Sequence, residues 1–86
     1  MADRQACVLV TGAARGMGAS HALALARGGW HVCLADVGDT ASVVDAIRAE
    51  GGSASGHLLD VTDSDAWARL ADQIAGGPAP LAGLVN

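Results

Sequence analysis

The 86-residue sequence predicts an α/β fold built on a parallel sheet, and three observations lead to that prediction. Short apolar runs alternate with segments whose apolar residues recur at helical spacing. A glycine-rich loop follows the first apolar run, where a strand would pass into a helix. Single helices between strands imply right-handed crossovers and parallel neighbours. The length allows one domain at most.

The first two strands and the helix between them follow from the apolar pattern. Residues 6–11 (ACVLVT) are almost continuously apolar, which is typical of a strand buried on both faces. Residues 17–27 place small and apolar side chains at helical spacing, and Gly28 and Gly29 then end the helix. Residues 30–35 (WHVCLA) predict the second strand, which closes on Asp36.

The next helix and strand are predicted from a cap and an apolar face. Asp39 or Thr40 can cap the helix, and glycines at 51–52 end it. Its buried face is expected to hold Val43, Val44 and Ile47. Residues 55–59 (SGHLL) form a weaker third strand.

A third helix and a fourth strand complete the alternation. Thr62 can cap the helix, with Asp63 and Asp65 in the first turn, where negative charge complements the helix dipole. The expected apolar face holds Trp67, Leu70, Ala71 and Ile74. Residues 76–80 (GGPAP) break the helix, and residues 81–85 (LAGLV) begin the fourth strand.

These elements predict a partial Rossmann-type, doubly wound parallel sheet (βαβαβαβ) with strand order 3-2-1-4. Residues 1–86 are expected to form the N-terminal, dinucleotide-binding half of a single Rossmann domain, truncated inside or just after the fourth strand. That strand would present an open apolar edge, so we expect the chain to associate with itself there.

The composition excludes several classes of protein. The net charge is −4 and the five basic residues are arginines spread singly, which excludes a nucleic-acid-binding surface. No apolar run approaches the roughly 20 residues that span a bilayer, and no signal peptide fits the first residues. Cys7 and Cys33 are expected out of register on neighbouring strands, as small buried residues rather than a disulfide framework. We therefore expect a cytoplasmic protein with no membrane partner.

The chain also lacks several kinds of chemical group. It has no lysine and no tyrosine, so no Lys amine or Tyr phenol can act as acid, base or nucleophile. His21, His31 and His57 stand outside the spacings of metal ligands. We assign no catalytic residue and no metal site to these residues.

The glycine loop carries the main functional signal. Gly12, Gly16 and Gly18 lie between the first strand and the first helix, spaced G-x-x-x-G-x-G. Gly12 would make the turn, Gly16 would let backbone approach a phosphate, and Gly18 would let the helix pack closely on the sheet. The amides at the helix start would then face the pyrophosphate of a dinucleotide.

Asp36 bears on the choice of cofactor. It lies at the end of the second strand, where an acid bonds the ribose hydroxyls of NAD. An ionised carboxylate there would repel the 2′-phosphate of NADP by roughly 4 kcal/mol per unit charge at ~4 Å, before screening. Arg15, in the glycine loop, could instead help to hold a 2′-phosphate. NAD is the predicted cofactor, and Arg15 keeps NADP as the alternative.

Four motifs together resemble the short-chain dehydrogenase/reductase family. They are TGAARGMG at residues 11–18, Asp36, DVT at residues 60–62 and LVN at residues 84–86. The resemblance covers the whole chain but only the N-terminal part of the family's domain. It implies that the adenosine ribose and the pyrophosphate are surrounded by Gly12, Arg15, Gly16, Met17 and Gly18.

The resemblance also implies roles beyond the glycine loop. Asp36 would bond the adenosine ribose, with Val37 beside it. Asp60 would accept a hydrogen bond from the adenine amino group, and the Val61 amide would meet the adenine ring. Asn86 would lie near the ribose of the cofactor. The residues themselves leave another role open for Asp60, as a cap before the third helix.

The family reaction implied is hydride transfer between a nicotinamide and an alcohol or ketone, through a tyrosine and a lysine that this chain lacks. We therefore expect the chain to be inactive alone and to meet a small alcohol or ketone only in a full-length parent. The alternatives are a non-catalytic nucleotide-binding module or truncated gene product, and an S-adenosylmethionine-dependent methyltransferase fragment. The loop spacing and the final LVN disfavour the methyltransferase.

Overall fold

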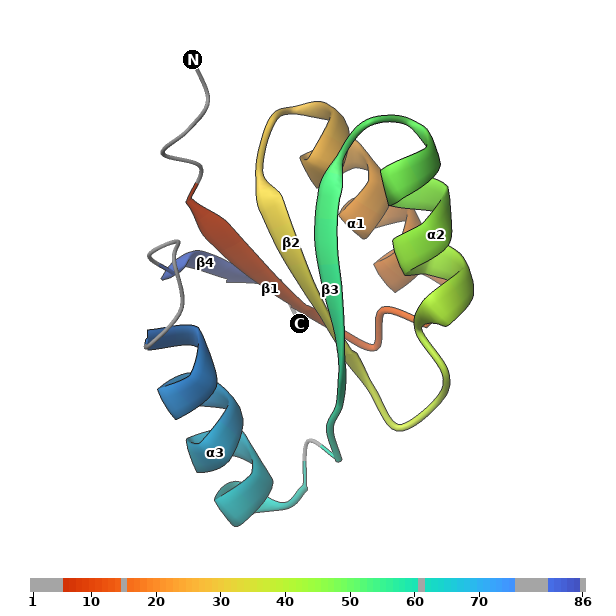
Figure 1. The fold of residues 1–86 in the computed structure, drawn as a ribbon. Helices are drawn as coiled ribbons and strands as arrows, with labels where there is room; N and C mark the ends of the chain where they lie inside the picture. Colours follow the sequence, from red (N-terminus) through yellow and green to blue (C-terminus); the bar gives the residue numbers. More distant parts are fainter. Residues whose placement is uncertain (1–5, 15, 61, 76–80, 86) are drawn as a thin grey trace.

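Strands and helices alternate strictly along the chain in the computed structural model, which describes residues 6–14, 16–60, 62–75 and 81–85 (Figure 1). The elements are β1 (Cys7–Thr11), α1 (Gly16–Arg27), β2 (His31–Asp36), α2 (Ala41–Ala49), β3 (Ser53–Leu58), α3 (Ser64–Ala75) and β4 (Leu81–Val85). The strands pair in parallel in the order β3-β2-β1-β4. The predicted α/β class and strand order are confirmed.

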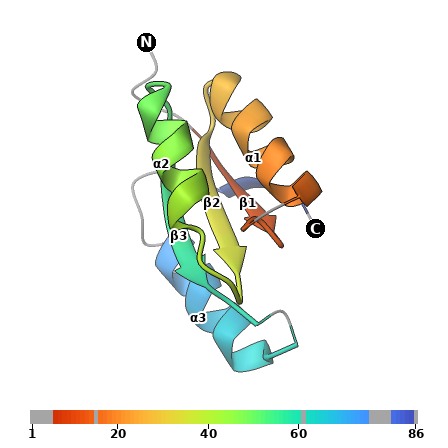
Figure 2. The ribbon, with the colours of Figure 1, turned by 90° about the vertical axis from the view of Figure 1, so that its right-hand side faces the viewer.

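Helices lie on both faces of the sheet, with α1 and α2 on one face and α3 on the other (Figures 1 and 2). Alternate residues of each strand face opposite sides, so both sets must be apolar where both faces are covered. Val8 and Val10 belong to the cluster of buried side chains that includes Val44 and Ile47 of α2. Their neighbour Leu9 belongs to the other cluster.

The second cluster joins the opposite face of β1 and β2 to α3. Its buried members are Cys7, Leu9, Cys33, Ala35, Leu59, Leu70 and Ile74. Trp67 packs against it and is half-buried. Ala71, which was expected on the same apolar face, is exposed. The apolar stripe of α3 is therefore narrower than the sequence predicted.

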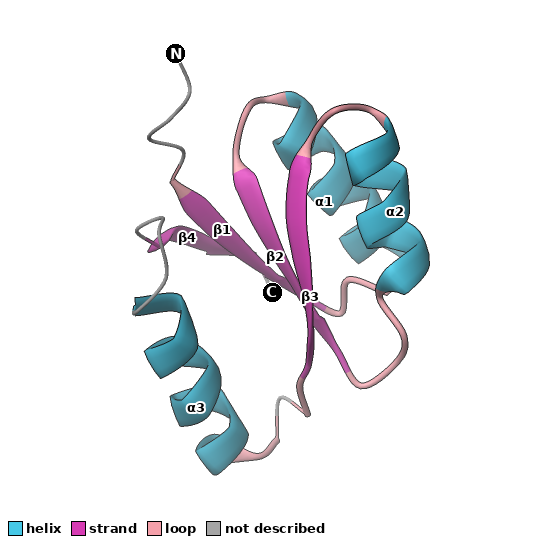
Figure 3. Cartoon of the chain, viewed as in Figure 1, coloured by secondary structure: helices cyan, strands magenta, loops and turns pink. Residues whose placement is uncertain are grey.

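Several element boundaries differ from the predictions. β3 begins at Ser53 rather than at residue 55, because Ser53 and Ala54 pair with His31 and Val32 of β2 despite their weak strand signal. Figure 3 shows β3 and β2 as neighbouring strands of the sheet. α1 begins one residue earlier, at Gly16, and β2 runs from His31 through Asp36. Residues 76–80, where a helix break was predicted, lie outside the described residues.

The cap predicted at Asp39 or Thr40 is confirmed for Asp39, and the cap predicted at Thr62 is wrong. Asp63 caps α3, since its Oδ1 accepts hydrogen bonds from the amides of Asp65 (3.0 Å) and Ala66 (3.1 Å). Thr62 was expected to be this cap and is not. At α2, Thr40 is the residue before the helix but makes no side-chain cap bond. Asp39 Oδ1 instead accepts from the Ala41 amide at 2.8 Å.

Candidate functional site

The turn from β1 into α1 depends on glycine at two positions. Gly12 has φ +63° and Gly16 has φ +64°, a region that costs other L-residues roughly 1–2 kcal/mol. A Cβ built at either position would have no atom within 4 Å. The backbone conformation therefore requires these glycines, and the space beside them is open to an approaching ligand.

Gly18 meets a different constraint. A Cβ at this position would overlap the Gly12 carbonyl oxygen and lie 2.8 Å from the Gly12 carbonyl carbon. The start of α1 therefore packs against the backbone of the glycine loop itself. The sequence predicted a close approach at Gly18, but to the sheet rather than to the loop.

Asp36 connects the glycine loop to the loop after β2. Its Oδ2 accepts a hydrogen bond from the Ala14 amide at 2.9 Å, and its Oδ1 accepts one from the Gly38 amide at 2.8 Å. The Ala13 amide also bonds the Ala35 carbonyl at 3.3 Å. The carboxylate is thus held at the mouth of the glycine loop by two backbone donors. A carboxylate offers about four acceptor sites, so ligand hydroxyls can be accepted beside such donors.

The end of β3 lies beside the same site. The Leu59 amide bonds the Asp36 carbonyl at 3.0 Å and so continues the pairing of β3 with β2. Asp60 follows, and its Oδ1 accepts hydrogen bonds from the Thr62 hydroxyl (2.6 Å) and amide (2.9 Å). These bonds, the hydroxyl first, lower the pKa of Asp60. Because Asp63 caps α3, Asp60 is not the helix cap, and its Oδ2 is not used by either Thr62 bond.

The structure places most of the predicted site residues at one edge of the sheet. The strands are parallel, so the residues that follow β1, β2 and β3 meet at the carboxyl edge. The residues found there are Gly12, Gly16, Met17, Gly18, Asp36, Val37 and Asp60. Met17 and Val37 are exposed, at 74% and 67%. Arg15, Val61 and Asn86 lie outside the described residues.

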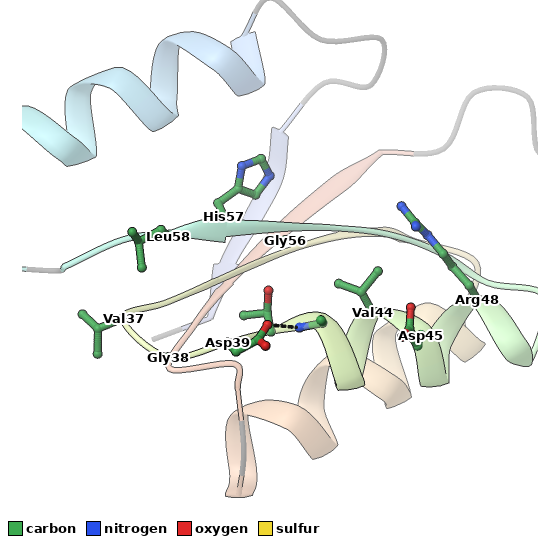
Figure 4. A pocket seen from close by; sticks show the side chains of 11 residues that line it. Val37, Gly38, Asp39, Val44, Asp45, Arg48, Gly56, His57 and Leu58 are labelled. Atoms are coloured by element: carbon green, nitrogen blue, oxygen red, sulfur yellow. Dashed lines mark hydrogen bonds between the residues drawn. The ribbon is translucent and has the colours of Figure 1, made fainter.

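An adjoining hollow was missed by sequence reasoning. It has a volume of about 630 Å³ and lies between α2 and β3, with Val37 and Leu58 at one end and Arg48 towards the other (Figure 4). Gly56 helps to shape it, because a Cβ there would overlap the Thr40 hydroxyl. The sequence signal was a glycine inside a strand, which often marks a close approach.

His31 and His57 lie on the α3 face of β2 and β3 rather than at the glycine loop, and His21 is exposed on α1. His31 Nδ1 contacts the Ser53 hydroxyl, and His57 Nε2 lies 3.1 Å from the Ser55 hydroxyl. Burial, the larger cause, and nearby positive charge lower the pKa of both histidines. Among the residues that the structure describes, no three His, Cys, Asp or Glu side chains are grouped to hold a metal ion.

No helix in the described ranges is both long and apolar enough to cross a bilayer.

Known proteins match both the sequence and the fold. The family model for short chain dehydrogenases matches residues 6–86. Cyclopentanol dehydrogenase of Comamonas testosteroni is 42% identical over 81 residues, which are 92% of this chain and 32% of that protein. The probable oxidoreductase EphD of Mycobacterium tuberculosis is 41% identical over 71 residues, or 79% of this chain and 12% of that one.

Solved structures agree with these relatives. A hydroxysteroid dehydrogenase from Escherichia coli superposes with TM-score 0.90 at 30% identity, over 98% of this chain and 37% of that one. A metagenomic short-chain oxidoreductase in complex with NADP gives TM-score 0.79 at 36% identity, over 87% and 35% of the two chains. The family model, the relatives and the solved structures named above are dehydrogenases or oxidoreductases, and they do not support the methyltransferase alternative.

The family match covers nearly the whole chain, and the glycine loop, Asp36 and the strand order agree with it. The chain spans 32% of the length of the cyclopentanol dehydrogenase that it matches. This chain belongs to the short-chain dehydrogenase family.

Proposed function

We propose that this chain is the NAD-binding part of an oxidoreductase that transfers hydride between a nicotinamide and an alcohol or ketone. The observation that carries the proposal is the position of Asp36, held against the glycine loop by the Ala14 amide. This brings a carboxylate to the place where a dinucleotide entering the loop would present its adenosine ribose. The name of the Comamonas relative, a cyclopentanol dehydrogenase, supports a secondary alcohol as the substrate class.

The residues present fit a dinucleotide. The backbone beside Gly12 and Gly16 is open, and the amide end of α1 favours the negative charge of a pyrophosphate. Asp36 would accept hydrogen bonds from the ribose hydroxyls, with Val37 beside them. Asp60 would accept from the adenine amino group through Oδ2. Contacts from Arg15, Met17, Gly18, Val61 and Asn86 are part of the same proposal.

The chemical step needs groups that this chain does not supply. The bound nicotinamide would carry the hydride, and the sequence has no tyrosine or lysine to move the proton of an alcohol. The chain's own residues would bind and orient the cofactor only. A hydride-transfer assay of the isolated chain with NAD and a panel of secondary alcohols should therefore give no turnover above background, and turnover would contradict this division of roles.

Calorimetry with ADP-ribose tests the binding proposal without the nicotinamide. ADP-ribose contains the adenine, ribose and pyrophosphate that the described residues would contact. We expect saturable binding, and we expect none for S-adenosylmethionine, which has no pyrophosphate. Absence of ADP-ribose binding at millimolar concentration would overturn the proposal.

A non-catalytic nucleotide-binding module is the second candidate, because the chain lacks both tyrosine and lysine. The two candidates differ when the chain is joined to the remaining part of a family member. An NAD-binding part of an enzyme should restore alcohol-dependent reduction of NAD in that fusion. A pure binding module should bind ADP-ribose and remain inactive.

The location of the protein and its self-association are also part of the proposal. We propose a cytoplasmic location, which the free thiols of Cys7 and Cys33 support. We also propose self-association through β4, because it is the last strand of the sheet in the part of the chain that the structure describes. Sedimentation should show mass rising with concentration, and a monomer at high concentration would contradict the association.

A further inference from the structure

Two buried thiols lie in contact on the α3 face of the sheet. Cys7 Sγ and Cys33 Sγ are 2.8 Å apart, and the residues are only 2% and 5% exposed. In the register of β1 and β2, Cys7 faces His31 and Cys33 faces Leu9, so the two cysteines are diagonal neighbours. Both belong to the cluster of side chains that packs under α3.

A chain of polar groups connects Cys33 to the surface. The Ser55 hydroxyl donates to Cys33 Sγ at 3.7 Å and lies 3.1 Å from His57 Nε2 and 3.4 Å from His31 Nε2. A hydroxyl can donate one hydrogen bond while it accepts another from a histidine N–H. Both histidines are half-buried. Cys33 therefore has a hydrogen-bond donor suited to a thiolate, and a polar path leads from it towards solvent.

Cys7 has a different environment. Burial first, and then the hydrogen bond with Cys33, raise the pKa of the Cys7 thiol to about 12. The Cys7 thiol therefore resists ionisation, and its sulfur lies in hydrogen-bond contact with the Cys33 sulfur, where either thiol can be the donor. The Cys33 sulfur accepts a hydrogen bond from the Ser55 hydroxyl, which would stabilise negative charge on it, so Cys33 is the better placed of the two to attack an oxidant first.

We propose that Cys7 and Cys33 are an oxidative modification site, at which hydrogen peroxide converts the two thiols into an intramolecular disulfide. The Cys33 thiolate attacks one peroxide oxygen, the O–O bond breaks, and Cys33 sulfenic acid forms as hydroxide leaves and takes up a proton. The Cys7 thiol then attacks the sulfenic sulfur, the S–O bond breaks, and the departing hydroxide takes the Cys7 proton, giving the S–S bond and a second water. One peroxide is reduced, two thiols are oxidised, and two waters are released.

The disulfide brings the two sulfurs closer together and leaves the cofactor site in place. An S–S bond is about 2.05 Å long, so the sulfurs must approach by about 0.8 Å from their contact distance. The bond would join the first residue of β1 to the middle of β2. The carboxyl ends of these strands, before Gly12 and at Asp36, are already held by the pairing of Thr11 with Ala35. Nucleotide binding should therefore be unchanged by the oxidation, and the inference stands apart from the proposed function.

The test is hydrogen peroxide treatment of the folded 86-residue chain, followed by alkylation in denaturant and intact-mass measurement. We expect monomers that have lost two hydrogen atoms and both alkylatable thiols, with full reversal by dithiothreitol. The same treatment of the unfolded chain shows that the oxidant is effective. Two thiols remaining in the folded chain would overturn the proposal, and so would dimers or a sulfinic acid as the main product.

Variants separate the roles of the three residues. Cys7→Ala should stop at a Cys33 sulfenic acid that dimedone traps, while Cys33→Ala should lose the fast reaction. Ser55→Ala should slow the first step about tenfold, as expected for one hydrogen bond to a charged sulfur. Ser42→Ala, an exposed serine on α2, is the matched control and should react at the original rate. If Ser55→Ala and Ser42→Ala oxidise equally fast, the role of Ser55 is wrong.

Discussion

Gly18 shows how one hydrogen atom in place of a side chain sets the shape of the site. Its missing Cβ allows the start of α1 to rest on the Gly12 carbonyl. The sequence predicted that glycine was needed here, from the spacing of the loop. It did not predict that α1 would contact the Gly12 carbonyl. That contact depends on the backbone angles of the turn at Gly12 and Gly16, which the residue types alone do not determine.

Gly18→Ala should therefore destabilise the chain and weaken nucleotide binding together. Forcing a methyl group into occupied space typically costs about 1–3 kcal/mol. We expect the free energy of unfolding, measured with urea, to fall by that amount. Gly83→Ala is the matched control, since a Cβ at Gly83 would meet nothing within 4 Å. Equal unfolding free energies for the two variants would show that the contact at Gly18 is not tight.

Asp36 was predicted from its place after the second strand, and its role in the loop was not. The bonds to the Ala14 and Gly38 amides require the backbone of two loops to converge on one carboxylate. An aspartate two residues before a glycine is a known turn signal, so the Gly38 bond had a sequence signature. The Ala14 bond joins residues far apart in sequence, and no local pattern encodes it.

At the scale of the elements, α3 shows why caps are hard to assign from sequence. Residues 62–64 (TDS) are three residues that all cap helices well. Only the geometry of the turn decides that Asp63 meets the free amides of Asp65 and Ala66. The error of one residue at Thr62 comes from this equivalence.

Asp63→Ala should reduce the free energy of unfolding by about 1 kcal/mol, the usual cost of losing a cap. Thr62→Ala should cost less, because the Thr62 hydroxyl bonds an exposed carboxylate, Asp60, and no helix amide. Urea unfolding of both variants compares them directly. A larger loss in Thr62→Ala would restore Thr62 as the cap.

The half-buried histidines His31 on β2 and His57 on β3 should make the stability of the chain depend on pH. Burial lowers the pKa of His31 and His57 from the usual 6.5, so the folded chain resists protonation more than the unfolded chain does. Between the lowered pKa values and 6.5 the unfolded state binds more protons, and stability therefore rises with pH. The stabilisation is complete above pH 6.5 and is lost as the pH falls towards the lowered values.

Unfolding with urea at several pH values measures this effect. The double variant His31→Gln with His57→Gln should have a flatter profile around pH 6.5 than the original chain. His21→Gln, an exposed position on α1, should keep the original profile. The explanation is wrong if the double variant and the His21 variant have the same slope.

At the scale of the whole molecule, the order of the strands was predictable and the contacts between separate elements were not. Alternating apolar runs and helices, with right-handed crossovers, lead to β3-β2-β1-β4. The diagonal contact of Cys7 with Cys33 and the hollow between α2 and β3 depend on side-chain directions across strands and helices. The sequence predicted that Cys7 and Cys33 would be out of register, and they are. Their sulfurs still touch, because diagonal neighbours on one face of a sheet can be in contact.

The chain spans 32% of the length of its Comamonas relative, and the part present is the part proposed to bind the cofactor. The claim is that Asp36 selects NAD, because its carboxylate bonds the ribose and repels a 2′-phosphate. Asp72→Ala, which removes an exposed aspartate on α3, changes the net charge equally and serves as the control.

Calorimetric titration of the original chain and of Asp36→Ala with NAD and with NADP measures this selectivity. We predict tighter binding of NAD than of NADP to the original chain. We also predict a ratio that falls about tenfold or more in Asp36→Ala, since 1.4 kcal/mol of lost discrimination is tenfold in affinity. The ratio should be unchanged in Asp72→Ala. Tighter binding of NADP to the original chain, or an NAD preference that survives in Asp36→Ala, would contradict the account.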